Sequence, residues 1–160
     1  MAYHDDLLAQ AVRLVHETPE SQASLRRAVS TAYYAVFHML VAASKSKWSD
    51  ANFRNMLGRA FDHGTMARAS GDFAKSDAYE FNEEKTAVVK TLRFVSRTFS
   101  QLQEQRHFAD YDLSKNLTHT EALAQVLSAK KVLEDWQSIQ DEEIAQAYLL
   151  SLLFKSRNSR

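Results

Sequence analysis

The sequence contains no cysteine, one proline and three glycines among its 160 residues. The lack of cysteine excludes a disulfide framework, a cysteine–zinc site and thiol catalysis, and it fits a reducing compartment. So few glycine and proline residues leave little material for turns, whereas alanine, leucine, glutamine, glutamate, lysine and arginine are abundant. This composition favours an all-α fold. A chain of this length most simply forms one domain with a sizeable core.

The sequence also has no excess of either charge and no long apolar run. Twenty basic residues balance twenty acidic ones, so any contact with RNA must come from a local patch. No apolar run reaches the roughly 18 residues that a membrane span needs. The first residues, MAYHDDLLAQ, lack the basic-then-apolar form of a signal peptide. We therefore expect a soluble, cytoplasmic protein that does not contact the membrane.

Metal and cofactor motifs are absent from the sequence. No two histidines stand four residues apart with an acidic partner, and no aspartate-rich loop is present, so we expect no zinc or calcium site. The glycines are too scattered to cradle a phosphate. We therefore predict neither a metal nor a cofactor.

Start signals and apolar spacing predict the first helices. A first helix is expected at about residues 2–16. A second is expected to begin with Thr18 as its N-cap and Pro19 at its first position, and to reach about residue 46. The stretch that follows it, KWSDANF, predicts a third helix with Ser49 as its N-cap.

The third helix is expected to be held at its start by Trp48 packing on Phe53, and to end near Gly64 in a left-handed conformation. Residues 65–80 show weak periodicity and suggest a loop with one helical turn at most. A fourth helix ends around Tyr111. Its core-facing residues recur at steps of four and three: Val88, Leu92, Val95, Phe99 and Leu102.

The last third of the chain carries one strong start signal and one unusually apolar segment. Thr118 and Glu121 form a capping box that opens a helix to about residue 140. The segment AYLLSLLF that follows is apolar on nearly every side, so it must be covered by the rest of the fold or by a second copy of the protein. The basic tail from about residue 155, KSRNSR, is expected to be frayed.

Two groups of polar residues interrupt the apolar faces. Arg27, Thr31, Tyr34 and His38 fall on one side of the second helix. They form either an ordinary solvated face or the lining of a site. The apolar face of the fourth helix continues into Arg106 and Asp110. Placing this pair on a buried face costs desolvation unless the two bond each other, so they are either a structural ion pair or functional groups.

Two motifs lie far apart in the sequence: AYYAVFH, residues 32–38, and RHFADY, residues 106–111. Together they resemble the HEPN family, the higher-eukaryote and prokaryote nucleotide-binding domains. The likeness is greatest to the small stand-alone bacterial branch and covers roughly residues 5–140. It implies a single domain over residues 1–160, an up-and-down bundle of about five to six helices that commonly dimerises.

The resemblance also implies an activity. Many members of the family are metal-independent ribonucleases, often toxins or defence effectors, and some pair with a small nucleotidyltransferase. Their signature is an arginine followed, after four to six residues, by a histidine. Arg106 matches the arginine, but Asp110 or Tyr111 stands where the histidine is expected. A site would therefore need His38 as the displaced histidine, beside Arg106, Asp110 and Tyr111.

Because the expected histidine after Arg106 is missing, three functions are considered. The first is a HEPN-like module, non-catalytic or weakly catalytic, that binds a nucleotide, RNA or a protein partner within a toxin–antitoxin or defence system. Its expected nucleotide- or RNA-binding residues are Arg27, Tyr34 and Arg106. The second is a metal-independent endoribonuclease toxin with a rearranged site. The third is a structural dimer or adaptor.

Overall fold

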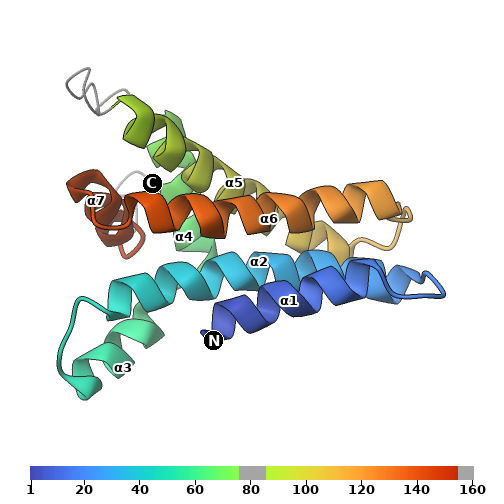
Figure 1. Ribbon diagram of the computed structural model, residues 1–160, viewed down its shortest axis with the longest axis horizontal. Helices are drawn as coiled ribbons and strands as arrows, with labels where there is room; N and C mark the ends of the chain where they lie inside the picture. Colours follow the sequence, from blue (N-terminus) through green and yellow to red (C-terminus); the bar gives the residue numbers. More distant parts are fainter. Residues whose placement is uncertain (76–85, 155–160) are drawn as a thin grey trace, which may run out of the picture. The chain divides into compact units, whose positions relative to one another are not determined.

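Every regular element in the described part of the chain is an α-helix. The computed structural model describes residues 1–75 and 86–154. Their helices are α1 (Tyr3–Val15), α2 (Gln22–Lys45), α3 (Ala51–Ala60), α4 (His63–Lys75), α5 (Thr86–Tyr111), α6 (His119–Ile139) and α7 (Glu143–Ser151) (Figure 1). The all-α class is confirmed. The described residues form seven helices, more than the expected five to six.

The chain divides into two compact units. The first unit comprises Met1–Met39 and Gln101–Glu134, and the second comprises Leu40–Ser100 and Asp135–Arg160. Helices α2, α5 and α6 each contribute residues to both units. No helix within residues 1–75 and 86–154 is long and apolar enough to cross a membrane. The predicted frayed tail and residues 76–80 of the predicted loop lie outside the described residues.

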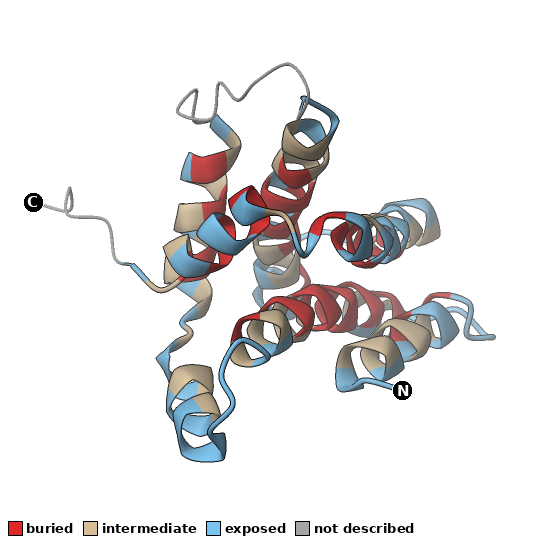
Figure 2. Cartoon of the chain, turned by 60° about the vertical axis from the view of Figure 1, so that its left-hand side comes forward, coloured by how far each residue is buried: buried red, intermediate tan, exposed pale blue. Residues whose placement is uncertain are grey.

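The predicted apolar faces of the long helices are buried, except at Val88 of α5, which is half-buried. Leu92, Val95, Phe99 and Leu102 of α5 are fully shielded from solvent, and Figure 2 shows buried positions running along α2 as well. Burial of such side chains stabilises each of them by roughly 1.5–3 kcal/mol relative to exposure. The recurrence of apolar residues at steps of three and four therefore explains why α2 and α5, the two longest helices, pack with one face in the core.

The capping box is confirmed at α6. The backbone N–H of Thr118 donates to the Glu121 carboxylate (2.9 Å), and the Glu121 N–H donates to the Thr118 hydroxyl (3.1 Å). The Thr118 hydroxyl also donates to the Glu121 carboxylate (3.1 Å). The hydrogen bond from the Thr118 backbone N–H, and then the one from its hydroxyl, lower the pKa of Glu121. The predicted contact of Trp48 with Phe53 also forms, with ring centroids 6.2 Å apart.

Two predicted N-caps are wrong by one to three residues. Helix α2 begins after Ser21, whose hydroxyl accepts the Ser24 N–H (3.1 Å), and not at Thr18 and Pro19. Helix α3 is capped by Asp50, which accepts the N–H groups of both Asn52 and Phe53, and not by Ser49. In both places a nearby residue with an equally good side-chain acceptor takes the cap.

The predicted loop after Gly64 is wrong for residues 65–75, which belong to α4. Gly64 does not end a helix in a left-handed conformation, because its φ is not positive. It lies in the first turn of α4, where the Asp62 side chain accepts the Thr65 N–H (2.9 Å). The chain thus breaks at residues 61 and 62 and then continues as a helix.

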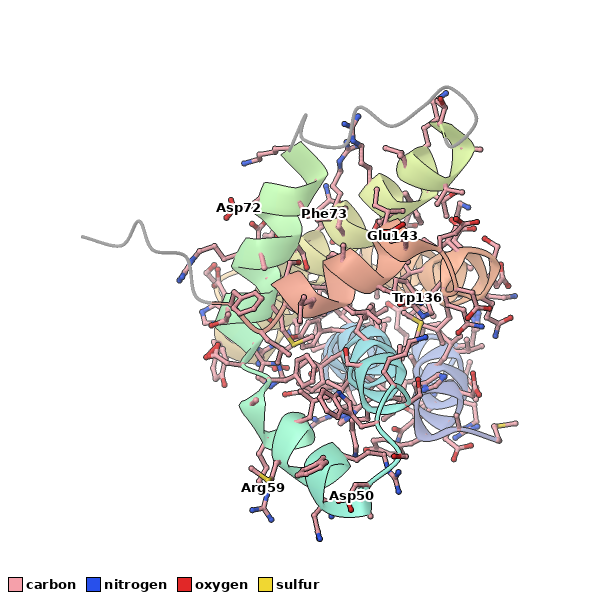
Figure 3. All side chains as sticks on the ribbon, turned by 90° about the vertical axis from the view of Figure 1, so that its left-hand side faces the viewer. Asp50, Arg59, Asp72, Phe73, Trp136 and Glu143 are labelled. Atoms are coloured by element: carbon pink, nitrogen blue, oxygen red, sulfur yellow. The ribbon has the colours of Figure 1, made fainter. Side chains whose placement is uncertain are left out.

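Helix α4 is held by burial within the second unit. Its buried residues are Met66, Ser70 and Phe73. Phe73 is directed toward α7 (Figure 3), where its ring lies 5.1 Å from that of Tyr148. A Cβ added at Gly71 would lie 3.5 Å from the Ser100 hydroxyl of α5, which is ordinary van der Waals contact, so α4 and α5 are neighbours here.

Candidate functional site

The polar stripe of α2 lines an open cleft. The cleft lies in the first unit, where α1 runs beside the first part of α2 (Figure 1), and its volume is about 400 Å³. All four residues of the stripe border it. The described lining residues are Tyr3, Leu7, Gln10, Arg27, Ser30, Thr31, Tyr34 and His38. The stripe is therefore the wall of a recess and not a flat solvated face.

Three aromatic rings meet at one end of this cleft. The ring centroids of Tyr3 and His38 are 4.9 Å apart in an edge-on arrangement. Those of Tyr34 and His38 are 6.3 Å apart. The ring of Tyr3 comes from α1 and the other two come from α2. The cleft therefore offers planar apolar surfaces together with the hydroxyl groups of both tyrosines.

Arg27 supplies the charge of the cleft. It is exposed, and it is the one lysine, arginine, aspartate or glutamate among the described residues that border the cleft. Within the described residues the side chain of Arg27 forms no hydrogen bond or ion pair. Its guanidinium is thus available to an anion, and the fork of N–H groups matches a phosphate or carboxylate in geometry.

Arg106 lies beside the cleft in a compact polar cluster. Its guanidinium forms an ion pair with Asp110 (3.6 Å) and donates to the Gln103 side chain (3.1 Å). It also lies 5.3 Å from the ring centroid of Tyr33 and 5.9 Å from that of Tyr34. The side chain of Arg106 is only 11% exposed. A carboxylate and two aromatic faces therefore balance its charge.

Two residues belong to both the cluster and the cleft. The hydroxyl of Ser30 donates to the Asp110 carboxylate (3.3 Å), and Ser30 borders the cleft. Tyr34 borders the cleft as well, and its ring contacts both Arg106 and His38. A ligand in the cleft would therefore touch groups that hold Arg106 and Asp110 in place.

The neighbouring arginine, Arg26, is engaged at the end of α5. Its guanidinium donates to the backbone carbonyls of Ala109 (3.0 Å), Asp112 (2.7 Å) and Lys115 (2.6 Å). These carbonyls have few helical partners because α5 ends at Tyr111. Arg26 thus stabilises a helix end, and its N–H groups are occupied.

The loop after α5 is ordered by its own hydrogen bonds. The backbone N–H of Ser114 donates to the Asp112 carboxylate (2.9 Å). Hydrogen bonds from Ser114, first from its side chain and then from its backbone, hold the pKa of Asp112 below its ordinary value. The carbonyls that bind Arg26 are therefore presented by a fixed turn.

The structure brings most of the predicted site residues together. Arg106, Asp110 and Tyr34 form one cluster, and Tyr34 also contacts His38. Tyr111 lies apart. It is 68% exposed, and among the described residues its ring contacts that of His107, with centroids 5.0 Å apart. The placement of Tyr111 offers no contact through which it could act with Arg106.

Three residues of the site could not be selected from the sequence. Tyr3 lies in another helix from the stripe, and nothing in its sequence surroundings marks it. Ser30 resembles any small helical residue until its bond to Asp110 is known. Tyr33 stands in the AYYAVFH motif, and this motif was the one signal that could have pointed to its contact with Arg106.

No cluster of metal ligands is present in the described ranges, where three or more histidine, cysteine, aspartate or glutamate side chains nowhere converge. Comparison of the chain with protein-family models, with curated proteins and with solved structures found no match. The function must therefore be inferred from the geometry of the cleft and its cluster.

Proposed function

We propose that the chain is a HEPN-like module, an up-and-down helical bundle that binds a nucleotide or a short stretch of RNA between α1 and α2. The composition of the cleft carries this proposal. It joins one available guanidinium, that of Arg27, to the three aromatic rings of Tyr3, Tyr34 and His38. A phosphate with an attached base needs this pair of surfaces, since the phosphate bonds arginine and the base stacks on a ring.

The size and polarity of the cleft agree with such a ligand. Its volume of about 400 Å³ lies within the range of small-molecule sites, roughly 300–1,000 Å³. Ser30, Thr31 and Gln10 add hydrogen-bonding groups to its wall. The neutral net charge of the chain leaves little attraction for distant phosphates, so recognition of one or a few nucleotides is favoured over wrapping of a long RNA.

The test measures binding and its dependence on Arg27. Nucleoside monophosphates are titrated calorimetrically, and a fluorescently labelled RNA of mixed sequence is followed by anisotropy. We expect Arg27→Ala to weaken binding about tenfold or more and to reduce the salt dependence by about one phosphate contact. Arg97→Ala is the matched control, because Arg97 is exposed on α5 in the second unit. Equal losses in the two variants, or no binding by the unaltered chain, would refute the proposal.

A metal-independent ribonuclease is the second candidate, and one contact favours it. The ring of Tyr34 touches both Arg106 and His38, so these two groups border one region. Arg106 would stabilise the phosphate charge and His38 would move a proton during attack by the 2′-hydroxyl of the RNA. The ion pair with Asp110 counts against this function, because it already compensates the charge of Arg106.

The ribonuclease is tested by cleavage of a labelled mixed RNA in EDTA. Cleavage that is lost in both His38→Ala and Arg106→Lys, with helical content retained, would establish the activity. Cleavage that persists in both variants would exclude this site. The resemblance further suggests a toxin–antitoxin or defence role with a small nucleotidyltransferase, which is tested by co-purification with the product of a neighbouring gene.

A further inference from the structure

The second unit carries a continuous apolar surface that is open to solvent. It is formed by the segment between α2 and α3, by α3, and by α7 with the residues that follow it, and we call it the α3–α7 surface. Its residues are Trp48, Phe53, Met56, Leu57, Leu150, Leu153 and Phe154. Every large apolar side chain of the second unit that is exposed among the described residues belongs to it.

The members of the α3–α7 surface adjoin one another. Trp48, Leu57, Leu150 and Leu153 border a single groove of about 440 Å³. The ring of Trp48 contacts that of Phe53, and Met56 lies one helical turn beyond Phe53. The groove therefore joins α3 to α7 through Trp48 and Leu57.

Helix α3 is covered only in part by the rest of the unit, with Leu57 half-buried. None of its ten residues is buried (Figure 2), although Phe53, Met56 and Leu57 lie along it. A helix of this length is marginal in water unless an apolar face is covered. Asp50 caps its start, but one cap contributes only about 1 kcal/mol. A partner that covers Phe53 and Met56 would add the apolar burial that α3 lacks.

The exposed apolar area suits a protein partner. Five of the side chains, Trp48, Phe53, Met56, Leu150 and Phe154, are each more than half exposed. Side chains of this kind expose on the order of 100 Å² each when half covered, giving roughly 500 Å² in total. Such an area is at the upper end for a monomer. With a polar rim it approaches the roughly 800 Å² that each partner contributes to a standard interface.

The charges at the rim favour a second copy of the chain as the partner. Lys47 and Glu143 both border the groove, and neither forms an ion pair within the described residues. Asp50 and Arg59 stand at the two ends of α3 (Figure 3). A two-fold interface requires a surface that complements itself, and a rim with both signs does so. The zero net charge of the chain adds no repulsion between copies.

We propose that the α3–α7 surface is the interface of a homodimer, in which Leu150 and Trp48 lie near the centre and Lys47 of one copy faces Glu143 of the other. This proposal is independent of ligand binding in the cleft of the first unit. A two-fold axis generates the Lys47–Glu143 contact twice, so it sets the register of the pair as well as its strength.

The first experiment measures the mass of the full-length protein in solution across a wide range of concentrations. We expect a dimer that Leu150→Glu dissociates, with a weakening of about tenfold or more, because the charge would be buried without a partner. Leu127→Glu is the matched control. Leu127 is 54% exposed on α6 in the first unit, against 57% for Leu150. A monomer at every concentration, or dissociation by Leu127→Glu alone, would overturn the proposal.

The second experiment tests the register by charge exchange. Lys47→Glu and Glu143→Lys each place like charges opposite one another twice in a homodimer, so each variant is expected to associate weakly. An equimolar mixture restores both attractive contacts and is expected to recover the dimer. Failure of the mixture to recover association would overturn the Lys47–Glu143 contact, and circular dichroism confirms that each variant is folded.

Discussion

The guanidinium of Arg106 lies 5.3 Å from the centre of the Tyr33 ring and 3.6 Å from the Asp110 carboxylate. The ring belongs to the buried face of α2, and the arginine belongs to the last turns of α5. The pair thus ties two helices of the first unit together. It gives Arg106 a structural role that is independent of any ligand.

Arg106→Ala is expected to lower the free energy of unfolding by about 1–3 kcal/mol, because it removes the cation from both rings and leaves Asp110 without its ion pair. Asp110→Asn should cost less, since the Asp110 side chain is more exposed, at 27% against 11%. Urea unfolding followed by circular dichroism measures both changes. A larger loss of stability in Asp110→Asn than in Arg106→Ala would contradict this order.

The adjacent arginines, Arg26 and Arg27, are expected to behave oppositely. Arg26→Ala leaves the carbonyls of Ala109, Asp112 and Lys115 without their donor, so we expect a loss of about 2 kcal/mol. Arg27→Ala should change stability by less than about 0.5 kcal/mol, because its side chain is exposed. The unfolding midpoints in urea compare the two directly, and equal losses would show that Arg27 has a structural partner too.

The capping box of α6 predicts that the protein loses stability in acid. Thr118 lowers the pKa of Glu121 below its ordinary value of 4.5. The stabilisation by the ionised group is therefore complete above that value and is lost as the pH falls through the lower folded-state pKa. Glu121→Gln should be less stable than the unaltered chain at neutral pH, and the difference should shrink in acid. Urea midpoints on both sides of pH 4.5 decide this, and a difference that stays constant with pH would contradict it.

The elements predicted most accurately are those whose signals are local. The core-facing side of α5 and the Thr118–Glu121 box each occupy a few turns of chain, so spacing and capping rules suffice to find them. Helix α4 shows the opposite case. Its buried residues are only Met66, Ser70 and Phe73, and Ser70 is held by Tyr148, far away in the sequence. Ser70 and the two glycines of this segment are residues typical of loops, so the sequence predicted a loop. The contact between Ser70 and Tyr148, which shows that the segment is packed, appears only in the structure.

The candidate site could likewise be predicted only where its signal lies within one helix. The stripe of Arg27, Thr31, Tyr34 and His38 follows from helical spacing alone. Whether it faced water or a recess depended on α1, where Tyr3 and Leu7 close the other side. The cluster around Arg106 could not be predicted either, because the contact of Arg106 with Tyr33 joins residues more than seventy positions apart. Spacing rules describe the residues of one helix at a time. The cleft and the Arg106 cluster are each formed by two helices, so these rules could not predict them.

A buried hydroxyl pair in the second unit predicts a loss of stability in alkali. The hydroxyl groups of Ser70 and Tyr148 lie 2.8 Å apart. Burial raises the pKa of Tyr148 well above its ordinary value of 10.0, and the hydrogen bond with Ser70 opposes this only in part. The folded state thus retains the phenol proton at a pH where the unfolded chain has released it. Stability is complete below about 10.0 and falls as the pH rises beyond it.

Tyr148→Phe isolates this effect. At neutral pH it should cost about 1 kcal/mol through the lost hydrogen bond, and it should flatten the alkaline fall in the free energy of unfolding. Tyr111→Phe is the matched control, because Tyr111 is exposed in the first unit. Urea unfolding at neutral pH and above pH 10 measures both variants. If Tyr111→Phe flattened the alkaline fall as much as Tyr148→Phe, the buried phenol would not be its cause.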